Sequence, residues 1–164
     1  MTDIEYTITK DIGNYLNDAI DLIISGGQWS SKSYVEKTII SAEYIALATH
    51  NKKLIGIFLA KNKLKFKDMT YCIGGLLSVN EEYRNKSVGY NLIKTRDNNS
   101  KIDLFIATIN PKNKISIKTF LKSKYKYHND LYYSKNFYER LYYKSISNKD
   151  ILNIKIILDN IINK

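Results

Sequence analysis

The sequence is short of the residues that build disulfides and metal sites, with one cysteine and two histidines among 164 residues. With Cys72 as the only thiol, no disulfide can form within the chain, and we expect Cys72 to be a small core residue rather than a nucleophile. One cysteine and two scattered histidines do not make a zinc site. No metal is therefore expected.

Long apolar runs are also missing. No window approaches about 18 apolar residues without charge, so no membrane span and no membrane partner is expected. Asp3 and Glu5 stand near the start, and no apolar segment follows a basic one there, so no signal peptide is predicted. These absences favour a cytoplasmic location.

Length and charge limit the remaining choices. A chain of 164 residues is expected to form a single domain over residues 1–164. Residues 1–82 carry nine basic and ten acidic side chains, whereas residues 83–164 carry 17 and six, so the net charge of +10 lies in the second half. A genome rich in A and T would favour lysine codons and explain this bias. Alternatively, the second half attracts a polyanion, either a phosphorylated cofactor or nucleic acid.

Hydrophobic periodicity predicts the elements of the first half. Ile4, Tyr6 and Ile8 alternate with polar residues and predict a strand. An apolar stripe at helical spacing runs from Asp11 to the stop at Gly26-Gly27. Ser31 or Ser33 could cap a second helix. Three apolar runs then predict a meander of antiparallel strands at 44–49, 54–60 and 69–79, with polar breaks at 50–53 and 61–68.

Two glycines interrupt the third of these runs. Gly74-Gly75 would weaken a strand unless a bulge or a close backbone approach needs it, and a ligand lying against the strand is one such need.

The second half predicts further elements. A helix starts at Val88 and frays at 97–99, and the run 102–108 is typical of a strand buried on both faces, which completes a right-handed βαβ unit. A helix opens at Asn113 with Ile115, Ile117, Phe120 and Leu121 on its apolar side. Tyrosine-rich strands at 125–134 and 136–146 predict a hairpin, and Ser147 or Asn148 may cap a last helix over about 148–163.

Residues 76–93 read as an apolar strand, a polar basic turn and the first turn of a helix. The start of a helix leaves backbone N–H groups without intrahelical partners. Those donors, the positive end of the helix dipole, and the neighbouring Arg84 and Lys86 together favour phosphate oxygens. The turn therefore predicts a phosphate site.

This order of elements resembles the GNAT superfamily of acyl-CoA-dependent N-acetyltransferases over about residues 1–146. Arg84-Asn85-Lys86-Ser87-Val88-Gly89 is similar to the pyrophosphate signature Gln/Arg-x-x-Gly-x-Gly/Ala, with Ser87 in place of the first glycine. Leu77-Ser78-Val79 matches the strand whose backbone, in the family, pairs with the pantetheine arm. The stretch from Asn113 to Phe120 resembles the family's Asn-x-x-Ala/Ser-x-x-x-Tyr helix.

The resemblance implies an α/β (α+β) fold with a mixed, mostly antiparallel central sheet flanked by helices, and a C-terminal extra helix outside the match. It also implies acetyl-CoA as co-substrate. The implied cofactor-binding residues are Leu77, Val79, Arg84, Asn85, Lys86, Ser87, Val88, Gly89, Tyr90, Asn113, Ser116 and Phe120.

The implied activity is transfer of an acetyl group to a primary amine of a small-molecule or protein acceptor. Phe120 stands where the family keeps its acid, a tyrosine, and cannot donate a proton. Three alternatives result. The proton donor is another side chain such as Tyr125 or Tyr127, the donor is a water molecule, or the protein has lost its activity. Glu81, Glu82 and His128 are candidate bases. His50 falls in a predicted hairpin turn and is expected to be exposed.

Two other readings stay open. One is a basic nucleic-acid-binding module whose tyrosines stack on bases; arginine is scarce for this role and no recognition motif is present. The other is a GNAT-fold protein that binds CoA without catalysis. The tyrosines at 125–143 suit half-exposed strands, and substrate stacking or a homodimer edge are the alternatives.

Overall fold

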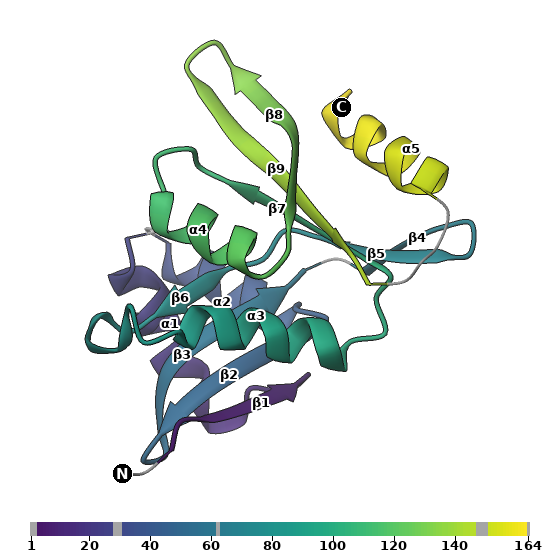
Figure 1. Ribbon diagram of the computed structural model, residues 1–164. Helices are drawn as coiled ribbons and strands as arrows, with labels where there is room; N and C mark the ends of the chain where they lie inside the picture. Colours follow the sequence, from purple (N-terminus) through teal and green to yellow (C-terminus); the bar gives the residue numbers. More distant parts are fainter. Residues whose placement is uncertain (1–2, 28–30, 62, 147–150, 164) are drawn as a thin grey trace. The chain divides into compact units, whose positions relative to one another are not determined.

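The computed structural model describes residues 3–27, 31–61, 63–146 and 151–163. The fold is mixed α/β, with sheets of mostly antiparallel strands accompanied by helices, as predicted (Figure 1). The chain divides into two compact units, the first formed by Met1–Asn62 with Gly75–Ser100 and the second by Lys63–Gly74 with Lys101–Lys164. Each unit contains one sheet. The prediction of a single domain stays a prediction.

The first unit contains an antiparallel four-stranded sheet in the order β1-β2-β3-β6. Its strands are β1 (Glu5–Thr9), β2 (Tyr44–His50), β3 (Lys53–Ala60) and β6 (Leu77–Val79). Its helices are α1 (Leu16–Ser25), α2 (Lys32–Ile40) and α3 (Val88–Asn99), and two short 3-10 turns are η1 (Gly13–Tyr15) and η2 (Glu81–Tyr83).

The helix predicted from Asp11 begins later than expected. Gly13 has a φ of 53°, which an α-helix does not allow, so η1 precedes α1. The predicted end is confirmed, because α1 stops at Ser25 and Gly27 has a φ of 71°. Ser31 caps α2 by accepting a hydrogen bond from the Tyr34 N–H.

The core of the first unit is formed by α1, α2 and one face of the sheet. The strand residues in this core are mostly two positions apart, and the helix residues are mostly three or four positions apart, so each element turns one apolar face inward. The buried members of this cluster are Ile12, Ala19, Ile20, Ile23, Val35, Ile39, Ala42, Ile45, Leu47, Leu54, Ile57, Leu59 and Leu76.

Helix α3 packs against the sheet over a glycine. A Cβ added at Gly56 of β3 would lie 2.9 Å from Leu92 Cδ1 and 3.1 Å from Val88 Cγ1. The helix extends through Asn99 rather than fraying at 97, since Arg96 and Asp97 are themselves buried. Arg96 Nη2 lies 2.7 Å from Asp97 Oδ1, and the guanidinium lies 4.0 Å from the centroid of the Phe58 ring. A buried ion pair thus closes the C-terminal end of α3.

The second unit contains a five-stranded sheet in the order β4-β5-β7-β9-β8. Its strands are β4 (Lys63–Phe66), β5 (Met69–Ile73), β7 (Leu104–Ile109), β8 (Lys126–Ser134) and β9 (Phe137–Ser145), and its helices are α4 (Lys114–Lys122) and α5 (Ile151–Ile162). β5 and β7 are parallel, and the other pairs are antiparallel. Helix α5 covers one face with Ile154, Ile157 and Leu158 against Met69, Leu104, Ile106 and Leu141.

The prediction of one strand over 69–79 was wrong. The run splits into β5 and β6, which belong to different sheets, and only β6 pairs with β3. Gly74 has a φ of 78°, and a Cβ on Gly75 would collide with the Leu59 carbonyl. The glycines therefore serve a break in the chain and a close backbone approach within the first unit, whereas we had suggested a ligand.

Two further expectations needed correction in this region. The polar break predicted at 61–68 contains β4, whose Leu64 and Phe66 alternate with lysines. The parallel partner of β7 is β5 and not the strand directly before α3, so the βαβ connection starts one strand earlier.

The closing hairpin is confirmed by the pairing of β8 with β9. The last helix is also present as α5, while the cap predicted at Ser147 or Asn148 lies outside the described residues. On α4 only part of the predicted apolar face is buried. Ile117 and Phe120 are covered, but Ile115 is 67% and Leu121 48% exposed.

Candidate functional site

The strand before the turn lies at the edge of its sheet. Leu59 N–H donates to the Leu76 carbonyl and Asn80 N–H to the Ile55 carbonyl, so the even-numbered backbone groups face β3. In an antiparallel pair the intervening groups, those of Leu77 and Val79, point the other way. The buried Ser78 hydroxyl donates to the Leu22 carbonyl at 2.9 Å and ties β6 to α1.

The polar loop after β6 is held by its own side chains. Asn80 accepts a hydrogen bond from the Glu82 N–H at 3.0 Å and so starts η2. At the other end, Arg84 Nε donates to the Val79 carbonyl at 3.3 Å. The loop therefore returns to the strand that it left, and Arg84 is held beside the start of α3.

Backbone handedness alternates through the turn. Asn85 and Ser87 have φ values of 63° and 61°, and Lys86 between them is not among the described residues with positive φ. Alternating handedness is typical of backbone turns whose N–H groups converge on an anion. Ser87 occupies the position of the family's first glycine, and its left-handed φ explains why glycine suits that position.

Ser87 is also the N-cap of α3. Its hydroxyl makes no capping hydrogen bond, and its carbonyl accepts from Asn91 N–H at 3.0 Å. The first-turn N–H groups, those of Val88, Gly89 and Tyr90, precede this first intrahelical bond and point out of the helix end. Because Arg84, Lys86 and Ser87 are exposed, an anion can reach this positive end.

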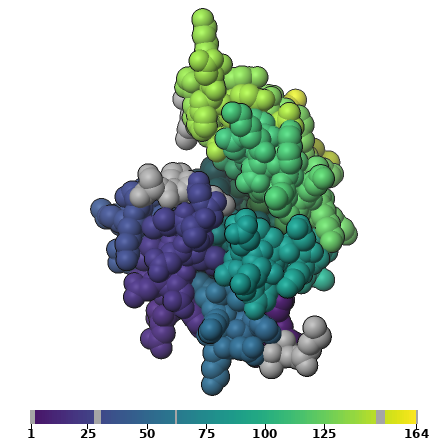
Figure 2. Space-filling view, turned by 90° about the vertical axis from the view of Figure 1, so that its left-hand side faces the viewer, coloured from purple at the N-terminus to yellow at the C-terminus, as the bar shows by residue number. Residues whose placement is uncertain are grey.

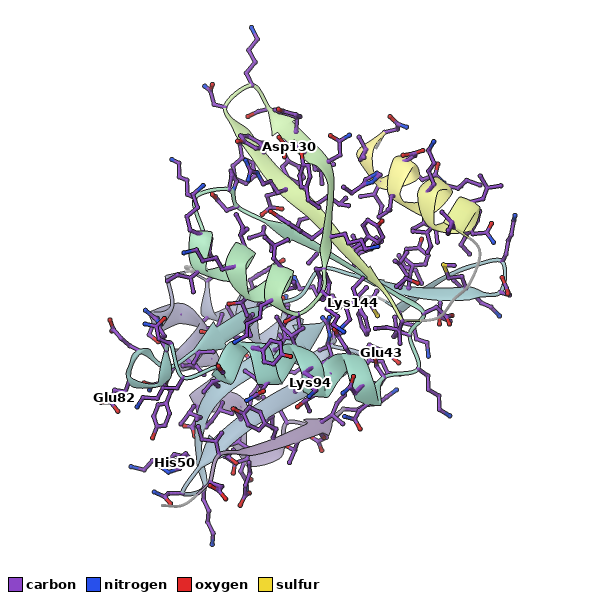
Figure 3. The ribbon with its side chains drawn as sticks, viewed as in Figure 1. Glu43, His50, Glu82, Lys94, Asp130 and Lys144 are labelled. Atoms are coloured by element: carbon purple, nitrogen blue, oxygen red, sulfur yellow. The ribbon has the colours of Figure 1, made fainter. Side chains whose placement is uncertain are left out.

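The turn is also attached to the β2–β3 hairpin. His50 Nδ1 lies 2.7 Å from the Tyr83 hydroxyl, and Lys86 Nζ lies 5.2 Å over the Tyr83 ring. His50 is the last residue of β2 and is half-buried, so our expectation of an exposed turn residue was wrong. Figure 3 labels His50 and Glu82 on these neighbouring segments. Sequence reasoning missed Tyr83, which has no periodic signal, and Asn80, whose turn-forming side chain was the one available clue.

The second predicted motif opens α4 in the second unit. Asn113 accepts a hydrogen bond from the Ser116 N–H at 3.0 Å, and Ile117 N–H donates to the Asn113 carbonyl. Asn113 is thus the N-cap of the helix. The Asn113 side-chain oxygen is therefore occupied by the capping hydrogen bond at the start of α4.

Phe120 and Tyr125 form one buried aromatic pair. Phe120 is 4% and Tyr125 2% exposed, and their ring centroids lie 4.9 Å apart, edge to face. Tyr125 N–H donates to the Phe120 carbonyl, and Lys144 Nζ lies 5.8 Å over the Tyr125 ring. Phe120 occupies the motif position of the family's tyrosine, and the side chain packed against it, Tyr125, carries a phenol hydroxyl.

The other two candidates of the second unit lie in different surroundings. The Tyr127 hydroxyl donates to Asp130 Oδ1 at 3.1 Å, and partial burial followed by the Asp130 carboxylate raises the pKa of Tyr127. His128 Nε2 lies 3.6 Å from Asp159 Oδ1 of α5. Tyr125, Tyr127 and His128 therefore have separate partners.

The predicted site residues fall into two groups. Leu77, Val79, Glu81 and the turn from Arg84 to Tyr90 belong to the first unit, where they are brought together around the start of α3. Asn113, Ser116, Phe120, Tyr125, Tyr127 and His128 belong to the second. Glu81 starts η2 and is exposed.

Neither a metal-binding cluster nor a membrane-spanning helix occurs in the described residue ranges. Within those ranges, no group of three or more His, Cys, Asp or Glu side chains is placed to hold a metal ion. None of the helices there is long and apolar enough to cross a membrane. Cys72 is buried on β5.

Solved structures resemble the chain over 86–88% of its length. A GNAT-family protein from Desulfovibrio desulfuricans superposes with a TM-score of 0.74, and 88% of this chain covers all of it at 9% identity. The chain has the GNAT fold. An acetyltransferase of the GNAT family from Bacillus cereus gives 0.67 at 16% identity, with 86% of this chain and 97% of that one covered.

NAA60 of Arabidopsis thaliana, solved with acetyl-CoA, also shares the GNAT fold. It gives a TM-score of 0.70 at 16% identity, with 88% of this chain and 99% of that one covered. No protein-family model and no curated protein matches the sequence. The GNAT fold is thus kept here at 9–16% identity to these three structures, and the fold resemblance predicted from the two motifs is confirmed.

Proposed function

We propose that the protein is an N-acetyltransferase that transfers an acetyl group from acetyl-CoA to a primary amine of a small-molecule or protein acceptor. The observation that carries this proposal is the left-handed Ser87 cap at the start of α3, directly after an edge strand, within a GNAT fold. That backbone would present N–H donors to a phosphate beside Arg84 and Lys86, which are exposed. NAA60, which has the same fold, was solved with acetyl-CoA.

The turn fits the pyrophosphate of CoA on the chemistry of its donors. Backbone N–H groups of the first helical turn and the side chains of Arg84 and Lys86 would hold the phosphate oxygens. As the family resemblance implies, Leu77 and Val79 of the edge strand β6 would lie along the pantetheine arm. Acetyl-CoA supplies the thioester whose acetyl group is transferred.

We propose Tyr125 as the proton donor to the leaving thiolate. It is the phenol packed against Phe120, which occupies the motif position of the family's tyrosine. Tyr127 and His128 are engaged by Asp130 and Asp159 respectively. Glu81 remains a candidate base for the acceptor amine, which must be neutral to attack.

Ligand-dependent thermal stability tests the cofactor assignment. A ligand at about 1,000 times its Kd adds about 4 kcal/mol to the free energy of unfolding, so millimolar acetyl-CoA should raise the melting temperature clearly if Kd is micromolar. Release of free thiol during incubation with a panel of amines then tests turnover. Absence of any shift with acetyl-CoA, CoA or longer acyl-CoA would refute the proposal.

A second candidate is a CoA-binding protein without catalysis. The observation that favours it is Phe120, a buried side chain without a hydroxyl at the motif position of the acid. The two candidates predict the same thermal shift and differ in thiol release. A shift without amine-dependent release would support this second candidate.

We place the activity in the cytoplasm. The single cysteine is a buried free thiol, which suits a reducing compartment.

A further inference from the structure

Helix α4 and the segments beside it carry an unbalanced positive charge. No Asp or Glu occurs between Asp103 and Asp130 in the sequence. Over the same stretch six lysines are exposed, and we call them the lysine cluster. Its members are Lys112, Lys114, Lys118, Lys122, Lys124 and Lys126.

The middle of this cluster is a row along one helix. Lys114, Lys118 and Lys122 are four residues apart, so they lie above one another on the same face of α4, each about 6 Å from the next. Ile115 and Leu121 lie at the two borders of that row by the 100° rotation per residue. The exposed face of α4 is therefore basic along its centre.

Tyrosines of β9 share the sheet face against which α4 packs, and two of them are Tyr138, which is half-buried, and Tyr142, which is buried. Leu141 of β9 packs with α5, so the alternate residues Tyr138, Arg140 and Tyr142 face the other way. Lys144 belongs to the same alternation, and it lies over Tyr125, which contacts Phe120 of α4. Helix α4 thus lies on the face of Tyr138.

The hairpin of β8 and β9 continues this face beyond α4. Tyr132 pairs with Tyr138 across the strands, and their rings stack with centroids 5.2 Å apart. Tyr132 is 66% exposed, so one face of its ring is open, and Tyr127 is 50% exposed on the same side. Figure 2 shows α4 in green next to the lighter green hairpin, both on the visible surface.

We propose that the lysine cluster and the exposed tyrosines of the hairpin form a binding surface for single-stranded nucleic acid. Lysines in a row neutralise successive phosphates, and open tyrosine rings stack on bases without regard to sequence. A membrane surface would favour aliphatic side chains along the centre of the exposed helix face with lysines at its borders, which is the reverse of the arrangement on α4. An acidic protein would leave the stacked tyrosine faces unexplained.

Fluorescence anisotropy with a labelled 20-nucleotide oligo(dT) and oligo(U) tests this surface. Binding should be tight at low salt and weaken as salt is added. A plot of log Kd against the logarithm of the salt concentration should be linear, with a slope of about 0.7 for each phosphate that the protein neutralises. The triple variant Lys114→Gln, Lys118→Gln, Lys122→Gln should reduce that slope by about two and lower affinity at least tenfold at low salt. Tyr132→Ala should weaken binding by about tenfold, and Tyr132→Phe should restore it.

The matched control removes the same charge elsewhere. Lys37, Lys52 and Lys53 are exposed in the first unit, and their triple change to Gln should leave the slope and affinity close to wild type. Equal losses of oligonucleotide affinity in the two triple variants would show that binding depends only on the net charge of the protein, and this would overturn the proposal. Equal binding of poly-glutamate, or displacement of the oligonucleotide by stoichiometric acetyl-CoA, would overturn it as well. None of these outcomes depends on acetyltransferase activity.

Discussion

Gly56 of β3 lies directly beneath Leu92 of α3, so close that a Cβ on the glycine would be 2.9 Å from Leu92 Cδ1. This contact sets how closely the helix approaches the sheet. The N-terminus of that helix is the proposed phosphate site. The contact between Gly56 and Leu92, one helical turn after the start of α3, therefore determines where the proposed phosphate site lies.

Gly56→Ala should lower the free energy of unfolding by about 1–3 kcal/mol, because the added methyl group overpacks the contact. Urea unfolding measures this loss. On a Leu92→Ala background the same change should cost clearly less, since the nearest atom has been removed. Additive losses in the double variant would mean that Leu92 does not set the approach.

Ser87 pays a conformational cost for its positive φ. Ser87→Gly should raise the free energy of unfolding by up to about 1 kcal/mol and keep acetyl-CoA binding, because glycine adopts the left-handed conformation without Cβ strain. Ser87→Val should do the opposite, since a branched side chain tolerates that conformation poorly. Both effects are measured by thermal unfolding with and without acetyl-CoA. A stabilising valine would show that the turn relaxes to another conformation.

Gly89→Asp should abolish the thermal shift caused by acetyl-CoA. The new carboxylate would stand among donors proposed for phosphate, yet an acidic residue in the first turn of a helix favours folding. The melting temperature of the variant alone should therefore be kept. Asn98→Asp, exposed further along α3, adds the same charge and should keep the shift. Retained affinity in Gly89→Asp would refute the placement of the pyrophosphate.

Tyr125→Phe tests the proposed acid. Removing the hydroxyl should lower kcat by roughly 10- to 100-fold, at the low end for a general acid because a thiolate leaves readily. The KM for acetyl-CoA should stay near its original value. Tyr71→Phe, a comparison on β5 of the same unit, should keep kcat. An unchanged kcat in Tyr125→Phe would assign the proton to another group or to water.

The raised pKa of Tyr127 predicts a dependence of stability on alkaline pH. The folded state holds this proton more tightly than the unfolded chain, so the stabilisation is complete below the unfolded pKa of about 10 and is lost as pH rises through the folded value. Tyr127→Phe should thus be less stable than wild type near pH 8, and the difference should narrow above about pH 10. Asp130→Asn should remove much of this dependence. A difference that is constant with pH would contradict it.

The sequence predicted those elements whose signal is local. The alternation in β1, the apolar runs of the β2–β3 hairpin and the end of the helical stripe at Gly26 depend on neighbouring residues, and these features were placed correctly. β4 was missed because its lysines alternate with Leu64 and Phe66, and the charged half of that alternation suggested a loop. The division of residues 69–79 between two sheets depends on pairing with distant strands, which local periodicity does not contain.

The candidate site shows the same division. The motif residues from Arg84 to Gly89 could be located in the sequence because strand, turn and helix are contiguous there. The left-handed conformation of Ser87 could not be predicted, because serine rarely adopts it. The hydrogen bond between His50 and Tyr83 could not be predicted either, because it joins positions 33 residues apart.

The buried pair of Arg96 and Asp97 limits how this helix can change over evolutionary time. Removing either partner alone would strand a charge in the interior, at a cost of about 3–5 kcal/mol, whereas an apolar replacement of both could be tolerated. Single substitutions there are thus expected to be lost from a population before a compensating second one arises. In relatives of this chain, the two adjacent positions should be inherited or exchanged as a unit.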